Sequence, residues 1–183
     1  MRINNDQINA SNKELLDAHK EDLVQLAKKH KNLEQIIDTI AKYNIAIPSW
    51  ALGAGGTRFG RFGFGGEPGN LEQKLDDVAV INDLTGSANA VSLHIPWDIL
   101  GNAEAIKAKA HLLGLNFDAM NSNTFQDQQD QEHSYKFGSL CHTDKVVRDQ
   151  AVAHNKEVID QGVALGSKSL TCLLYTSPSP RDS

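Results

Sequence analysis

The residues best suited to chemistry lie in the stretch 91–98, Val-Ser-Leu-His-Ile-Pro-Trp-Asp. Apolar and polar residues alternate up to Ile95, which is typical of a strand with one buried face. Pro96 ends this predicted strand because proline has no backbone N–H. His94 then stands at a strand end, where β/α proteins place their active sites, and could transfer a proton or bond a ligand. The alternative is an imidazole bonded only to backbone groups. Asp98 is better placed to cap a following helix than to act in catalysis.

Two tryptophans follow neighbouring predicted strands. Trp50 comes after the short apolar stretch 45–47, and Trp97 comes after the strand that carries His94. Tryptophans of this kind are commonly core aromatics. They could equally form the flat walls of a sugar site, because the C–H faces of a sugar pack on aromatic rings.

The glycine-rich stretch 51–70 is too long to be an ordinary connection. Its glycines fit neither the dinucleotide fingerprint nor a P-loop. Its arginines and phenylalanines could contact single-stranded nucleic acid, but the chain is acidic. We interpret the stretch as a lid that excludes water from a site, with a disordered loop as the alternative. No metal site is predicted, because His133, His142 and His154 lack the spacing of known motifs.

These residues must be positioned by alternating strands and helices. Two N-terminal helices are predicted, the first opened by a capping box at Ser11 and Glu14 and the second starting near Asn32. Strands at 45–47, 91–95, 115–120 and 168–171 alternate with helices at 71–84, 102–114 and 144–166. This order predicts a parallel sheet, either doubly wound or part of a barrel. Polar residues at three strand ends favour an α/β fold with N-terminal helices and about four β/α units, the first half of a (β/α)8 TIM barrel.

Composition excludes several classes of function. The chain has 183 residues, 40% of them hydrophobic, and a net charge of −5. No basic block suggests nucleic acid as a partner, and no apolar run is long enough for a membrane span. The polar N-terminus and the two cysteines, Cys141 and Cys172, indicate a cytoplasmic location.

The last twelve residues, 172–183, break the preceding pattern. They resemble the translation of a transposase adapter used in preparing DNA sequencing libraries, although a natural Ser/Pro-rich tail is the alternative. We therefore expect a non-native tail at 172–183. Residues 1–171 are then the N-terminal portion of a single barrel domain that continues beyond them.

Several segments together resemble L-rhamnose isomerase, in the bacterial branch with broad aldose specificity. The resemblance covers nearly all of residues 1–171. The matching segments include 47–50, 55–59, 66–68, 74–77, 91–98, 117–125, 133–136, 154–155 and 166–168. It implies a xylose-isomerase-like barrel, a homotetramer, and Mn²⁺ or another divalent cation whose ligands come from later strands. The implied reaction interconverts L-rhamnose and L-rhamnulose, as in rhamnose catabolism, by metal-assisted hydrogen transfer between C1 and C2, with other aldoses such as D-allose as further substrates.

The resemblance also implies roles for individual residues. His94 would contact the sugar near its ring oxygen or O1 and assist ring opening, while Trp50, Trp97 and Phe125 would bind the sugar. Phe59 would act as a lid over the neighbouring subunit's site. The fragment alone is expected to be inactive and without metal. A related barrel epimerase or xylose-isomerase-like enzyme, or a non-catalytic carbohydrate-binding or scaffold protein, are the alternatives.

Overall fold

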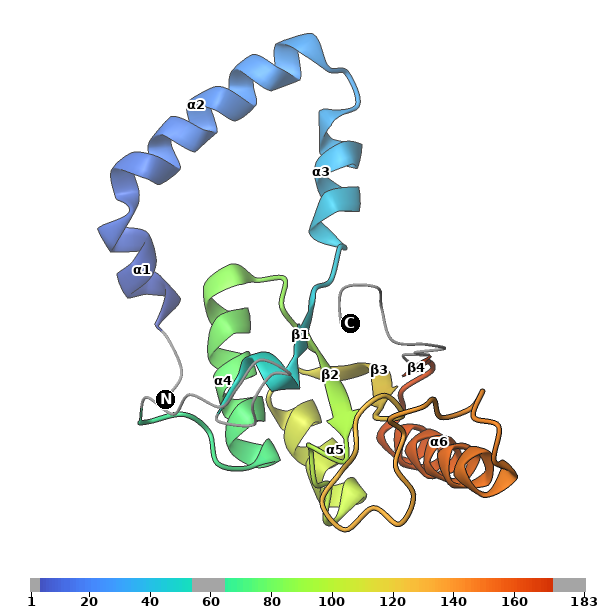
Figure 1. Ribbon diagram of the computed structural model, residues 1–183. Helices are drawn as coiled ribbons and strands as arrows, with labels where there is room; N and C mark the ends of the chain where they lie inside the picture. Colours follow the sequence, from blue (N-terminus) through green and yellow to red (C-terminus); the bar gives the residue numbers. More distant parts are fainter. Residues whose placement is uncertain (1–3, 54–64, 173–183) are drawn as a thin grey trace.

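The computed structural model describes residues 4–53 and 65–172 (Figure 1). The predicted lid residue Phe59 and nearly all of the predicted non-native tail lie outside these residues. The described residues form six α-helices, a short 3-10 helix and four strands. In chain order they are α1 (Asn5–Ser11), α2 (Lys13–Lys29), α3 (Leu33–Ala41), β1 (Ala46–Pro48), η1 (Ser49–Ala51), α4 (Leu71–Thr85), β2 (Ala90–Ile95), α5 (Ala103–Leu112), β3 (Asn116–Ser122), α6 (Lys145–Leu165) and β4 (Leu170–Cys172).

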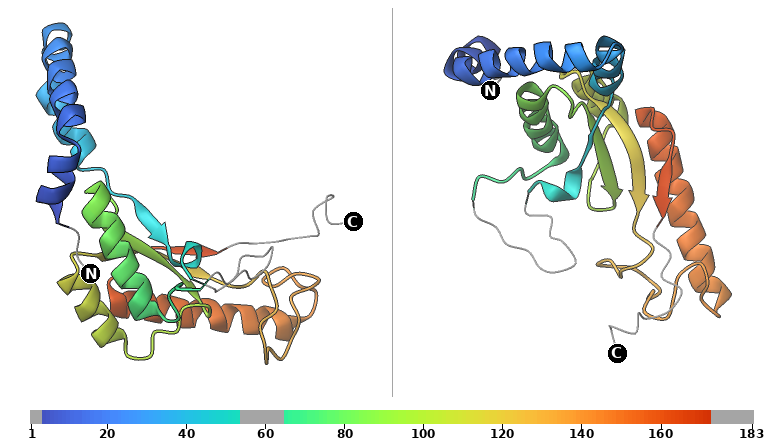
Figure 2. Two further views of the ribbon diagram at one scale, coloured as in Figure 1. Left: turned by 90° about the vertical axis from the view of Figure 1, so that its left-hand side faces the viewer. Right: turned by 90° about the horizontal axis from the view of Figure 1, so that it is seen from above.

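The four strands form one parallel sheet in the order β1-β2-β3-β4. Each crossover advances by one strand in the same direction, so right-handed connections place every crossover helix on the same face. Helices α4, α5 and α6 accordingly lie together on one side of the sheet (Figure 2). A doubly wound sheet would reverse its strand order and carry helices on both faces. The α/β prediction is confirmed, and the arrangement is consistent with part of a (β/α)8 barrel.

The core lies between the sheet and these helices. Val91, Leu93 and Ile95 of β2 are buried and point towards the helix layer, as the alternating pattern predicts. They pack in one cluster with apolar residues of α4, α5 and α6, among them Leu75, Val78, Ile106, Ala110 and Val158. Because side chains alternate along a strand, Ser92 and His94 point to the opposite face of the sheet.

The ends of α6 carry the caps that their residues favour, whereas the capping box predicted at Ser11 does not form. The side chain of Asp144 accepts the N–H of Val146 at the start of α6, and Gly166 ends α6 in the left-handed conformation, with φ of 90°. The predicted capping box at Ser11 is wrong, because Ser11 is the last residue of α1. Helix α1 begins at Asn5, and its N-cap Asn4 accepts the N–H of Asp6 with its side chain. The predicted helix is α2, which begins at Lys13 after Asn12, and the Asn12 side chain makes no cap hydrogen bond.

The first three helices form an arm that extends away from the sheet (Figures 1 and 2). Neither α2 nor α3 contains a buried residue. Apolar side chains of the arm are therefore exposed, among them Leu15, Leu23, Val24, Ile36 and Ile40. Within the described residues, no helix combines the length and apolar character needed to cross a membrane.

Candidate functional site

An aromatic cluster surrounds His94 at the carboxyl end of β2. The imidazole stacks on Trp97, with ring centroids 3.7 Å apart and planes inclined by 16°. Trp50 and Phe125 meet the same imidazole edge to face, at 5.6 Å and 5.8 Å. The structure thus brings together the four described residues that the sequence predicted to bind a ligand. We call His94, Trp50, Trp97 and Phe125 the aromatic cluster.

The environment of His94 keeps its ring neutral and chemically available. The residue is only 4% exposed, and neither ring nitrogen has a hydrogen-bond partner. Burial is the main cause that lowers the pKa of His94 to about 4, although the Asp98 carboxylate acts in the opposite direction. Near neutral pH one ring nitrogen can therefore donate a hydrogen bond and the other can accept one. The alternative prediction, an imidazole bonded to backbone groups, is not what the structure has.

A buried network centred on Asp98 lies directly behind the aromatic cluster. Lys74 Nζ lies 2.7 Å from Asp98 Oδ1, and the other carboxylate oxygen accepts the N–H of His94 at 2.8 Å and the hydroxyl of Ser49. The prediction for Asp98 is wrong, because Asp98 does not cap a helix: α5 starts at Ala103 with Asn102 as its cap. Lys74 of α4 is buried, although a lysine is usually exposed. A buried carboxylate needs such partners, because an unpaired buried charge is costly.

The end of β3 adds a polar group that the site prediction had not included. Asn123 is 2% exposed, and both polar atoms of its side-chain amide lack a partner. Its N–H donates to the carbonyl of Ile95 at 3.0 Å, continuing the pairing of β2 with β3. Asn121 pairs with His94 in register, so Asn123, two residues further on, lies on the same side of the sheet as His94. In the sequence, Asn123 could have been recognised by its position after a predicted strand.

His154 reaches the same strand ends from α6. Its Nε2 atom lies 3.2 Å from the carbonyl oxygen of Ile95 and 3.3 Å from the backbone nitrogen of Asn123. The predicted helical pattern placed His154 on the buried side of its helix, and the residue is indeed half-buried. It supports the backbone of the two strand ends.

The described residues do not fit the divalent cation that the resemblance implies. Nowhere in residues 4–53 and 65–172 do three or more His, Cys, Asp or Glu side chains gather in a way that could hold a metal ion. The ring of His142 instead accepts the N–H of Asp144 at 2.9 Å, and the backbone of His133 bonds Gln150 at 3.0 Å.

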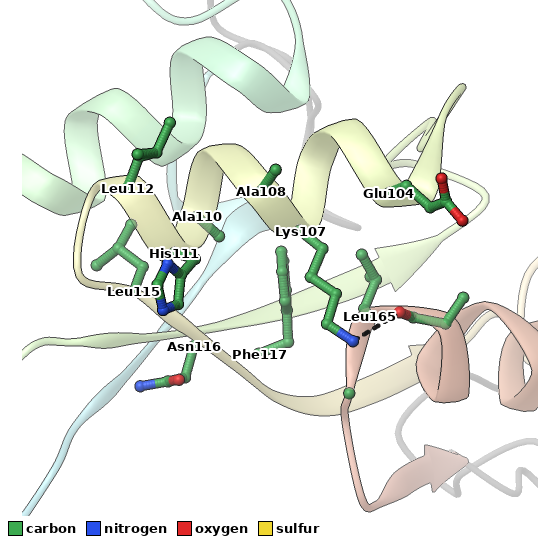
Figure 3. Close-up of a pocket in the computed structure, with 12 residues that line it drawn as sticks. Glu104, Lys107, Ala108, Ala110, His111, Leu112, Leu115, Asn116, Phe117 and Leu165 are labelled. Atoms are coloured by element: carbon green, nitrogen blue, oxygen red, sulfur yellow. Dashed lines mark hydrogen bonds between the residues drawn. The ribbon is translucent and has the colours of Figure 1, made fainter.

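A separate hollow of about 800 Å³ lies at the opposite end of the strands, between α5, the start of β3 and the end of α6 (Figure 3). Lys107 crosses it and donates to the carbonyl oxygen of Ala164 at 3.2 Å. A cation at the carboxyl end of a helix stabilises the helix dipole. The hollow contains no residue of the aromatic cluster, and its charged group links two helices.

Comparison with known proteins finds two relatives of similar sequence. The chain is 52% identical over 167 residues to a "Probable sugar isomerase" of Rhizobium meliloti, covering 91% of this chain and 39% of that protein. A second "Probable sugar isomerase", of Mesorhizobium japonicum, is 52% identical over 139 residues, covering 76% of this chain and 32% of that protein. The chain is similar to sugar isomerases. No family model matches it.

The two sugar isomerases are much longer than the aligned region. The chain spans about two-fifths of the first relative and about a third of the second. Over the aligned region the chain is similar to both relatives at an identity near one half.

Proposed function

We propose that this chain is the N-terminal portion of an aldose–ketose isomerase that interconverts L-rhamnose and L-rhamnulose and also accepts other aldoses. The observation that carries the proposal is the neutral, buried imidazole of His94, unpartnered and surrounded by aromatic rings at the strand ends. Similarity to two probable sugar isomerases supports the same class of substrate.

The aromatic cluster suits a sugar for two reasons. The faces of Trp50 and Trp97 offer apolar area to the C–H groups of a pyranose, and indole rings lose little entropy on binding. The imidazole of His94 and the amide of Asn123 supply buried donors and acceptors for hydroxyl groups. A site built to bond hydroxyls rejects analogues that lack them, because its own polar groups are then left unpaired. Phe125 would cover the apolar end of the sugar.

In this proposal His94 assists ring opening. The O1 hydroxyl loses its proton, a carbonyl forms at C1, the bond between C1 and the ring oxygen breaks, and the ring oxygen gains a proton. A neutral imidazole can accept the first proton at one nitrogen and deliver a proton from the other. The hydrogen transfer between C1 and C2 is assigned to groups beyond the described residues.

Other features implied by the resemblance remain proposals for the complete protein. These are the homotetramer, the divalent cation, the cytoplasmic location and the reach of Phe59 into a neighbouring site. The residues that would hold the cation are expected in the continuation of the chain.

The decisive experiment uses the complete reading frame of the source gene. The purified protein is incubated with L-rhamnose, D-allose and D-xylose, and the ketose products are identified by chromatography. Conversion of L-rhamnose to L-rhamnulose with the highest kcat/KM is the expected result. A product epimerised at one carbon would favour the related epimerase, and sugar binding without conversion would favour a carbohydrate-binding protein. Either result would overturn the proposal.

A further inference from the structure

Asp98 makes two hydrogen bonds to His94, and these bonds close the loop that carries Trp97. The N–H of Asp98 donates to the carbonyl of His94 at 2.8 Å, and the carboxylate of Asp98 accepts the N–H of His94 at 2.8 Å. Trp97 lies between the two bonded residues, and its indole stacks on the imidazole. The stacking geometry therefore depends on the conformation that Asp98 fixes.

The same carboxylate reaches the second tryptophan through its neighbour. Ser49 donates its hydroxyl to Asp98 Oδ2, and Ser49 directly precedes Trp50 in the short helix η1. Ser49 is fully buried. The Asp98 side chain, in the loop after β2, therefore also holds the loop after β1. That loop carries Trp50, whose ring meets the imidazole of His94 edge to face.

Lys74 fixes the carboxylate itself. Its ammonium lies 2.7 Å from Asp98 Oδ1, and the two side chains are only 8% and 0% exposed. A buried carboxylate with every neighbouring donor engaged has no freedom to rotate. Because Lys74 belongs to α4, its ammonium links the helix layer to the loops that follow β1 and β2.

We propose that Asp98 is a positioning residue of the sugar site, and that Lys74 and Ser49 hold it in place. Its carboxylate orients the imidazole of His94 and both indoles without touching the sugar. This inference rests on the proposed function, because a positioning role presupposes a ligand for the aromatic cluster.

The test compares two variants in the complete protein. Asp98→Asn replaces one acceptor oxygen with an NH2 donor that the Lys74 ammonium repels. The remaining amide oxygen therefore turns to Lys74, and the bonds from the N–H of His94 and the hydroxyl of Ser49 are lost. We expect KM for the aldose to rise about tenfold, the equivalent of one charge-assisted hydrogen bond, with a much smaller change in kcat. The near-ultraviolet circular dichroism of the tryptophans should change in the same variant.

The double variant Lys74→Met with Asp98→Asn tests rescue. Without the ammonium, the amide can turn its oxygen towards the N–H of His94 and the hydroxyl of Ser49. We expect KM to return to within about threefold of the wild-type value, since both orienting bonds are restored. A KM that stays raised overturns the inference, because orientation through these two bonds would then not account for the loss.

A matched ion pair outside the site serves as the control. Lys109 Nζ lies 2.8 Å from Asp76 Oδ2 and joins α5 to α4. Neither residue belongs to the aromatic cluster or bonds Asp98, and the pair is more exposed than Lys74 and Asp98. Asp76→Asn should leave both KM and the tryptophan signal unchanged. If Asp98→Asn behaves in the same way while folded, the inference is wrong.

The design separates this inference from the proposed function. A wild-type protein that converts no aldose overturns the proposed function whatever the variants do. The tryptophan signal still decides the positioning role in that case. A changed signal in Asp98→Asn with recovery in the double variant upholds it, and an unchanged signal overturns it.

Discussion

The buried position of the His94 imidazole lowers the stability of the fold and is typical of a ligand site. Three aromatic rings exclude water from it, and neither ring nitrogen finds a partner in the folded chain. Burying polar groups without hydrogen bonds costs free energy, about 1–3 kcal/mol for each group. Such a cost is expected where a ligand supplies the missing partners.

This environment predicts how stability depends on pH. The unfolded His94 binds a proton below its ordinary pKa of 6.5, whereas the folded residue does so only near 4. The unfolded state therefore binds more protons in this window, and the free energy of unfolding falls as pH drops from about 7 to 4, by up to about 3 kcal/mol from this residue. In His94→Gln the decline should be smaller by that amount. Urea unfolding of both proteins at pH 8 and pH 5 should show about 2 kcal/mol of this difference, because pH 5 still lies above the folded pKa. Equal declines would contradict the prediction.

Asn123 offers a second test of the cost of burying a polar group without a hydrogen-bond partner. Replacing its unpartnered amide by an apolar group of similar shape, in Asn123→Leu, should raise the free energy of unfolding by about 1 kcal/mol. The same change should weaken sugar binding at least about tenfold, since the ligand loses a buried polar contact. Thermal unfolding and calorimetric titration measure the two effects. Loss of stability together with unchanged binding would show that the amide has a structural role instead.

Individual residues show where sequence reasoning reached its limit. The position of His94 at a strand end could be predicted because the alternation along the strand and the proline after it are local signals. Lys74 could not be placed by its charge, although Leu71 and Leu75 beside it in α4 are buried and a lysine three residues after Leu71 lies on their face. What buries it is Asp98, which is 24 residues away in the chain. No local pattern reports such a partner.

At the scale of elements, the predicted order of strands and helices from β1 onwards was correct, because strands and helices differ in period and helices carry stop signals. Gly86 and Gly166 end α4 and α6, both with positive φ. Helix α1 was not predicted. The start of α2 was predicted wrongly, because a Ser with a Glu three residues later also arises by chance. The close packing of α6 on β3 could not be predicted, since it depends on distances between elements.

That packing predicts the effect of a substitution in the middle of α6. A Cβ added at Gly162 would lie 2.8 Å from Cγ of Met120, which is buried in β3. Alanine favours a helix by about 1 kcal/mol over glycine, but overpacking costs about 1–3 kcal/mol. Gly162→Ala should therefore lower stability by up to about 2 kcal/mol in thermal unfolding.

A double-mutant cycle isolates the contact behind this effect. In the background Met120→Ala there is no Cγ to meet the new methyl group. Gly162→Ala should then stabilise the protein, because only the helix preference remains. Destabilisation of similar size in both backgrounds would mean that Met120 is not the cause.

On the scale of the whole molecule, the described part leaves much surface without a partner. The strands β1 and β4 each pair with one neighbour within the described residues, so each presents an open edge. Open edges and exposed apolar side chains promote association between chains. The arm of α1, α2 and α3 adds exposed apolar residues, among them Ile36, Ile37 and Ile40.

These features predict that residues 1–171, expressed alone, will associate or aggregate. Sedimentation velocity and binding of a hydrophobic dye should show large species with exposed apolar surface. The complete protein, under the same conditions, should sediment as one defined species with little dye binding. A monodisperse fragment with cooperative unfolding would contradict the prediction. It would also favour a self-sufficient domain over a part of a longer barrel.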